Sequence, residues 1–102
     1  MAQPENEIRL DAAALERLLA GGGWRREGSA ITRTFTFKRF KGAMAFANGV
    51  AEAANLANHH PDIHIERYRL VRIVLTTHVT NGISDADIEL ARRIDALETS
   101  AT

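Results

Sequence analysis

The chain has 102 residues, of which 45% are hydrophobic and 25% are charged, and its 13 basic and 13 acidic side chains give a formal net charge of zero. This composition predicts one soluble domain over residues 1–102, and the lack of net positive charge argues against nucleic-acid or membrane binding as the main activity. The absence of cysteine excludes a disulfide framework and a thiolate nucleophile. No unbroken apolar segment typical of a signal peptide occurs near the start, so we expect a cytoplasmic protein.

The first predicted element is a short amphipathic helix. Residues 1–7 are polar, and we expect them to be frayed. Leucines then recur at helical spacing up to the glycines that begin at Gly21, and Asp11 is suitably placed to cap the first turn. Residues 30–37 alternate β-branched and aromatic side chains with a period of two, which predicts a strand. The preceding "EGS" indicates a hairpin turn from a short strand near Trp24.

The second half of the chain repeats this order. Residues 40–60 are rich in alanine, with apolar side chains at steps of three and four, and predict a long helix that ends at Pro61. We expect Gly42 and Gly49 to allow this helix to pack closely on the sheet. Residues 62–78 predict two strands joined by a tight turn at "ERYR". Residues 84–98 predict a closing helix, with Ser84 and Asp87 as a start resembling a capping box.

The predicted order is therefore α-β-β-α-β-β-α. Strands that pair as hairpins form an antiparallel sheet, so we expect an α+β fold with a four-stranded antiparallel sheet and three helices on one face. The free edges of such a sheet need protection, which makes a homo-oligomer a reasonable expectation.

All four histidines lie between residues 58 and 78. Imidazoles are common at helix ends, where their positive form offsets the helix dipole. Three of them could instead hold zinc, but adjacent histidines point in different directions and seldom converge on one ion. A third explanation is acid–base chemistry, because imidazole titrates near neutrality and a cluster can supply both a proton donor and a proton acceptor. His64 lies on the strand face opposite its isoleucine neighbours, and we expect it to have no role.

Proton transfer is the explanation that the positions favour. His59, His60 and His78 stand at the predicted ends of elements, where side chains can reach a cleft. Asp87 belongs to the first turn of the closing helix, and it can start that helix and also orient an imidazole. We therefore expect an acid–base pocket and no metal site.

Several motifs together resemble the pterin-4a-carbinolamine dehydratases. They are "GW" at 23–24, "FTFKRFKGAMAF" at 35–46, "NHHPDI" at 58–63, "LTTH" at 75–78 and "NGISDADIELARRID" at 81–95, and they extend over most of the chain. The resemblance implies the same α+β fold, assembly into a homodimer or homotetramer, and no metal or bound cofactor. It also implies that water is eliminated from 4a-hydroxytetrahydrobiopterin, a 4a-hydroxytetrahydropterin, to give quinonoid dihydropterin for aromatic amino-acid hydroxylases.

The site residues follow from the same resemblance, position by position. It implies a pterin pocket whose catalytic residues are His59, His60, His78 and Asp87 and whose substrate-binding residues are Pro61 and Thr77. We expect one histidine to protonate the leaving hydroxyl while another accepts a ring proton. His60 and His78 are our candidates for these transfers, with His59 binding the pterin.

The chain departs from the family pattern at three points. Asn55 stands where family members usually carry an acid, Val79 follows the third histidine in place of an acid, and the segment from Pro61 to Tyr68 is one residue longer. We expect the turn to absorb the extra residue, because an insertion within a strand would turn every later side chain to the opposite face. Losing these carboxylates is expected to lower the basicity of the imidazoles and so reduce turnover.

A non-catalytic role is the alternative. Proteins similar to the dehydratases also act as binding partners, including a rubisco assembly factor and a transcription coactivator. The assembly-factor branch lacks the histidine set that this chain retains.

Overall fold

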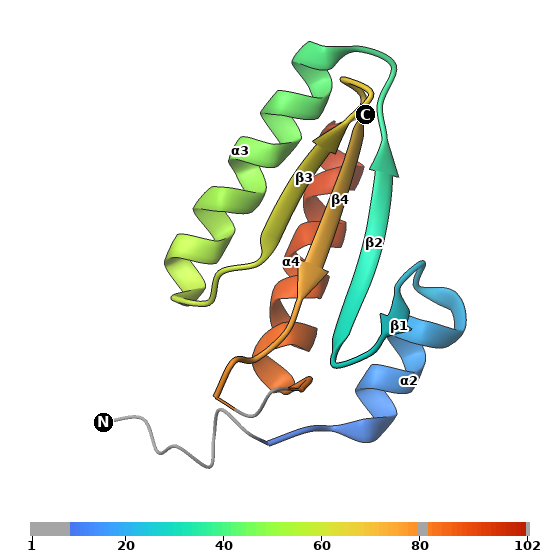
Figure 1. Ribbon diagram of the computed structural model, residues 1–102, viewed down its shortest axis with the longest axis vertical. Coiled ribbons are helices and arrows are strands. Elements are labelled where there is room, and N and C mark those ends of the chain that lie inside the picture. The colour runs from blue at the N-terminus through green and yellow to red at the C-terminus, as the bar shows by residue number, and fades with distance from the viewer. Residues whose placement is uncertain (1–8, 80–81, 102) are drawn as a thin grey trace.

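The four strands form one antiparallel sheet in the order β1-β2-β4-β3. The computed structural model describes residues 9–79 and 82–101, with the side chains of 99–101 left out. Residues 1–7, which we expected to be frayed, lie outside this part. The elements are α2 (Ala12–Gly21), β1 (Arg25–Glu27), β2 (Ala30–Thr36), α3 (Phe40–Ala57), β3 (Asp62–Glu66), β4 (Leu70–Leu75) and α4 (Asp85–Ala101) (Figure 1). The predicted order and the α+β fold class are confirmed.

One face of the sheet and all three helices share a single hydrophobic core. Alternate residues of the two central strands are buried, and so are the apolar stripes of the helices, which include Leu15 of α2, Val50 of α3 and Ile94 of α4. On the opposite face of the sheet, Thr34 and His64 are exposed. The period of two in the strands and the helical spacing elsewhere therefore select the same core.

The hairpin between β3 and β4 turns at two residues with left-handed backbone. Arg67 and Tyr68 have φ angles of 51° and 57°, and the amide of Arg69 donates to the carbonyl of Glu66. Positive φ at both central positions is the geometry of the type I′ turns that favour hairpins. The pairing from Asp62 to Glu66 is continuous along β4. Glu66 pairs with Leu70, so the connection between the two strands consists of residues 67–69.

Two details of α3 differ from our expectations. The helix ends at Ala57, four residues before Pro61, because Asn58 adopts a left-handed conformation (φ 51°, ψ 41°) and its amide donates back to Ala54 and Asn55. Asparagine tolerates this conformation and so acts as the helix stop. A Cβ on Gly49 would meet Leu97 of α4 rather than the sheet. Gly49 thus contributes to the packing of α3 against α4, not against the sheet.

Arg33 is the one charged residue on the apolar side of β2 between Ile31 and Phe35. Its guanidinium lies 2.7 Å from Asp95 and 3.2 Å from Glu98 on α4, and it stacks 4.5 Å from the centre of the Phe35 ring. Trp24 also donates to Asp95 at 3.0 Å. Burial raises the pKa of Asp95 above its ordinary value, and the Trp24 hydrogen bond and the Arg33 charge offset this only in part.

The ends of several elements meet at one end of the molecule. The last turn of α3, the start of β3, the end of β4 and the first turn of α4 lie together, whereas α3 begins at the opposite end (Figure 1). The histidine-bearing segments are therefore brought together by the fold, although His60 and His78 are 18 positions apart in the sequence.

Candidate active site

His59 and His60 follow the left-handed stop of α3. The amide of His59 donates to the carbonyl of Ala54 at 3.1 Å, which holds the chain close to the helix end. The His59 side chain is 17% exposed, whereas His60 is exposed. One imidazole is therefore turned inward, and the next stays at the surface.

His59 is anchored by a fully buried carboxylate. Its Nε2 lies 2.6 Å from Oδ1 of Asp87, and Asp87 has an exposed fraction of 0%. The other oxygen of Asp87 accepts from the hydroxyl of Thr77 at 2.8 Å and from the backbone amide of Ser84 at 3.0 Å. The amide contact is the capping-box bond that the sequence predicts. One carboxylate therefore starts α4 and holds an imidazole.

His60 has a neutral partner. Its Nε2 lies 3.1 Å from Oδ1 of Asn55, which belongs to the last turn of α3. An amide can accept or donate a hydrogen bond, whereas a carboxylate can only accept. Asn55 therefore gives His60 a partner that fits Nε2 both with and without its proton.

His78 lies beyond the end of β4, on the other side of the candidate site. It follows an isolated antiparallel bridge between Thr77 and Gly82, which closes the loop between β4 and α4. The segment "VTNG" at residues 79–82, whose composition predicts a turn, lies partly outside the described residues. His78 and the adjacent Val79 are both exposed, and the exposed fraction of Val79 is 72%.

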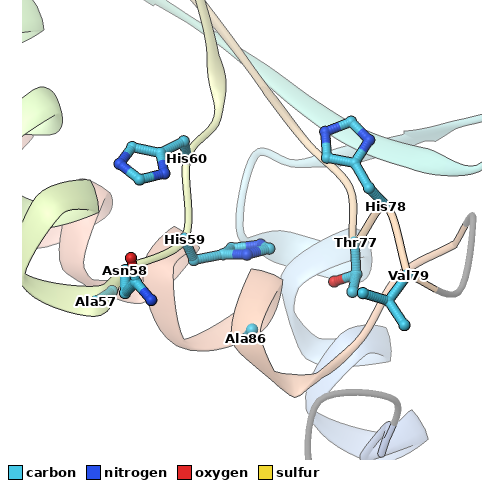
Figure 2. A pocket seen from close by; sticks show the side chains of 8 residues that line it. All are labelled: Ala57, Asn58, His59, His60, Thr77, His78, Val79 and Ala86. Atoms are coloured by element: carbon cyan, nitrogen blue, oxygen red, sulfur yellow. The ribbon is translucent and has the colours of Figure 1, made fainter. Parts of the chain in front are cut away.

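The three histidines line one cavity of about 500 Å³. Figure 2 shows His60 and His78 on opposite sides, with the His59 ring between them and nearer to α4. The lining residues are Ala57, Asn58, His59, His60, Thr77, His78, Val79 and Ala86. Small-molecule sites typically have volumes of ~300–1,000 Å³, so the size suits a ring system with a few polar anchors.

The other candidate residues lie differently. Pro61 is half-buried at the start of β3 and is not among the residues that line the cavity. Asp87 lies behind His59 and contacts the cavity through it. Thr77 lines the cavity, but its hydroxyl points to Asp87 and its exposed fraction is 4%. His64 is exposed on β3, outside the cavity, as predicted.

Sequence reasoning missed part of this site. Ala57, Asn58 and Ala86 line the cavity, and Ser84 lies 2.6 Å from the hydroxyl of Thr77. The αL preference of asparagine before "HHP" could have placed Asn58. No sequence pattern indicates the Ser84–Thr77 contact, because it depends on how the end of β4 meets the start of α4.

Comparisons with known proteins assign a family to this chain. The family model described as pterin 4 alpha carbinolamine dehydratase matches residues 8–97. The chain belongs to this family. A relative in Thermomicrobium roseum, provisionally named pterin-4-alpha-carbinolamine dehydratase, is 52% identical over 87% of this chain and 96% of its own length.

Solved structures support the family fold. A protein from Brucella melitensis described as a transcriptional coactivator/pterin dehydratase has a TM-score of 0.76 and 35% identity, over 87% of this chain and 97% of its own. A pterin dehydratase-like protein identified as a RuBisCO assembly factor in the alpha-carboxysome has a TM-score of 0.61 over 74% of this chain and 86% of its own. At 22% identity, the second likeness concerns the fold alone.

Two further properties concern the described residues. Within residues 9–79 and 82–101, no group of three or more His, Cys, Asp or Glu side chains is arranged to hold a metal ion. In the same part of the chain, no helix is long and apolar enough to cross a membrane.

Proposed function

We propose that this protein is a 4a-hydroxytetrahydropterin dehydratase that uses histidine acid–base catalysis. The observation that carries the proposal is the convergence of His59, His60 and His78 on one cavity of about 500 Å³. Membership of the dehydratase family supports the same reaction. In the reaction, the bond between C4a and its hydroxyl oxygen breaks, a proton leaves a ring nitrogen, and the hydroxyl departs as water after gaining a proton.

The environments of the histidines support a division of roles. His60 and His78 are exposed on opposite sides of the cavity, where they can exchange protons with a bound pterin. We assign the two proton transfers to this pair, and each is expected to contribute ~10²–10⁴-fold to the rate. His59 is held by Asp87 at 2.6 Å, which suits a residue that binds and polarises the pterin in a fixed orientation.

The proposal extends to the assembly and to the cell. We propose a cytoplasmic homodimer or homotetramer that takes a small pterin as substrate and requires neither direct nucleic-acid contact nor a membrane. The two edge strands, β1 and β3, leave backbone groups available for pairing between subunits. Light scattering of the purified protein measures the number of subunits.

A non-catalytic partner role is the competing function. The RuBisCO assembly factor shares the fold at 22% identity, and the Brucella protein is described as a coactivator as well as a dehydratase. The retained histidine set, with its buried anchor Asp87, favours catalysis, because binding another protein does not need imidazoles held inside a cavity.

Stopped-flow dehydration of a synthetic 4a-hydroxytetrahydropterin tests the proposal. The dehydratase function predicts that the wild-type protein accelerates the reaction in proportion to its concentration, by at least ~10²-fold at saturation. A rate equal to that of buffer alone would remove the enzyme function and leave the partner role.

A further inference from the structure

Two hydroxyl groups form a chain that ends on the carboxylate behind His59. Thr77 Oγ1 donates to Oδ2 of Asp87 at 2.8 Å and lies 2.6 Å from Oγ of Ser84. A threonine hydroxyl has one proton to donate, and here Asp87 receives it. Ser84 must therefore donate to Thr77, and the hydrogen bonds run in one direction, from Ser84 through Thr77 to Asp87.

This chain is closed to solvent. The exposed fractions are 0% for Ser84, 4% for Thr77 and 0% for Asp87. Water is therefore not available to replace a lost donor, and a buried carboxylate that loses a hydrogen bond is destabilised. With Oδ2 occupied by the Thr77 hydroxyl and the Ser84 amide, Oδ1 is the oxygen that faces His59.

The carboxylate in turn determines where His59 carries its proton. Because an ionised carboxylate only accepts hydrogen bonds, Nε2 of His59 must donate across the distance of 2.6 Å. In the neutral ring, Nδ1 then has the free lone pair. A carboxylate that can rotate would no longer enforce this choice, and the ring could exchange tautomers.

We propose that Thr77 and Ser84 are positioning residues that hold Asp87 as an acceptor, so that His59 stays in the Nε2–H tautomer with Nδ1 left for the pterin. The role of this nitrogen in the reaction rests on the proposed dehydratase function, whereas the tautomer itself does not. In this proposal the side chain of Thr77 acts through Asp87.

Nitrogen NMR of the histidine rings tests the inference in the full-length protein. Long-range proton–nitrogen correlation spectra, recorded at alkaline pH, separate a protonated ring nitrogen from one with a free lone pair, and His59→Gln assigns the signals. Thr77→Val removes the hydroxyl at nearly constant shape. We expect it to raise the Nδ1–H population of His59 about tenfold or more, as for a lost hydrogen bond to a charged group.

Thr76 provides a matched control. Its hydroxyl lies 2.7 Å from the carbonyl oxygen of Ser29 and 3.2 Å from that of Gly82, so it is directed at these backbone oxygens and not at Asp87. We expect Thr76→Val to leave the His59 signals unchanged and Thr77→Ser, which keeps the hydroxyl, to restore them. Ser84→Ala should raise the Nδ1–H population of His59 in the same way as Thr77→Val, by a smaller factor. It provides the test by itself if Thr77→Val does not fold.

Dehydration kinetics separate this inference from the proposed function. If both are right, Thr77→Val lowers kcat/KM about tenfold, because less of His59 presents a free Nδ1 lone pair to the pterin that it binds and polarises. A tautomer shift in a protein with no dehydratase activity would support the inference and reject the function. His59 signals of Thr77→Val or Ser84→Ala that match those of Thr76→Val would overturn the inference, whatever the activity.

Discussion

Nε2 of His59 lies 2.6 Å from Oδ1 of Asp87, although the two residues are 28 positions apart in the sequence. α3 ends at Asn58, directly before His59, and Asp87 belongs to the first turn of α4. Helix capping and imidazole orientation thus depend on the same buried carboxylate. The folding of α4 and the geometry of the candidate site are therefore linked, and a change at Asp87 should affect both.

Asp87→Asn tests this link. The His59 ring, the Thr77 hydroxyl and the Ser84 amide all donate to the Asp87 carboxylate, so the amide group of asparagine must face at least one of them with a donor of its own. We expect the free energy of unfolding to fall by about 1–3 kcal/mol and kcat to fall by about 10²-fold or more. Urea unfolding and stopped-flow dehydration measure these effects. Glu89→Gln, an exposed change on the same helix, should alter neither, and equal effects from both variants would contradict the link.

Asn55→Asp tests the neutral partner of His60. A carboxylate 3.1 Å from Nε2, the present distance of the amide oxygen, would favour the protonated ring and keep it protonated at higher pH. If His60 protonates the leaving hydroxyl, the alkaline limit of the pH–rate profile should move upward by about one pH unit. Asn48→Asp adds the same charge on an exposed position of α3. A profile that moves equally in both variants, or in neither, would exclude this role for the Asn55 contact.

Arg33, Asp95 and Trp24 give a prediction about stability and pH. Burial raises the pKa of Asp95 in the folded chain above the ordinary value of 3.8, so the folded chain binds this proton more tightly than the unfolded chain. The resulting stabilisation is complete below pH 3.8 and is lost as pH rises through the folded pKa. Relative to Asp95→Asn, the wild type should therefore lose stability as pH rises from 3 to about 7. Urea unfolding across that range measures the difference, and a constant or increasing advantage of the wild type would be inconsistent with it.

Substitution of three glycines by alanine should reduce the stability of the fold by different amounts. Gly23 has a φ of +89°, and a Cβ there would lie 2.8 Å from Nε of Arg33, so we expect Gly23→Ala to destabilise by about 2–3 kcal/mol. Gly28 has a φ of +61° but open space around it, and its change should destabilise by about 1–2 kcal/mol. Gly21 has neither constraint. Thermal or urea unfolding should rank the losses Gly23, Gly28, Gly21, and any other order would contradict the geometry.

The sequence predicts those features that depend on local periodicity. Alternation in residues 30–37 and 62–75 indicates the strands, the spacing of Ile88 and Ile94 indicates α4, and Asp11 caps α2 as expected. The end of α3 was misplaced because the left-handed stop at Asn58 takes effect before the steric restriction of Pro61. Local rules compete at such ends, and single-sequence reasoning does not rank them.

The candidate site was predicted as a group of residues but without its internal contacts. The resemblance placed the three histidines and Asp87 together, and the structure brings these segments to one end of the fold. Which imidazole meets Asp87, and where the Thr77 hydroxyl points, depend on the relative positions of α3, β4 and α4. These are tertiary distances between segments far apart in the chain, and neither periodicity nor spacing encodes them.

A series of four single histidine-to-alanine variants, measured by stopped-flow dehydration, tests the central claim most directly. The chain supplies its own control, because His64 is exposed on β3 outside the cavity that His59, His60 and His78 line. The account predicts that kcat/KM falls by ~10²–10⁴-fold for His60→Ala and His78→Ala, falls for His59→Ala, and stays at the wild-type value for His64→Ala. Wild-type activity in His60→Ala and His78→Ala, or an equal loss in His64→Ala, would contradict it.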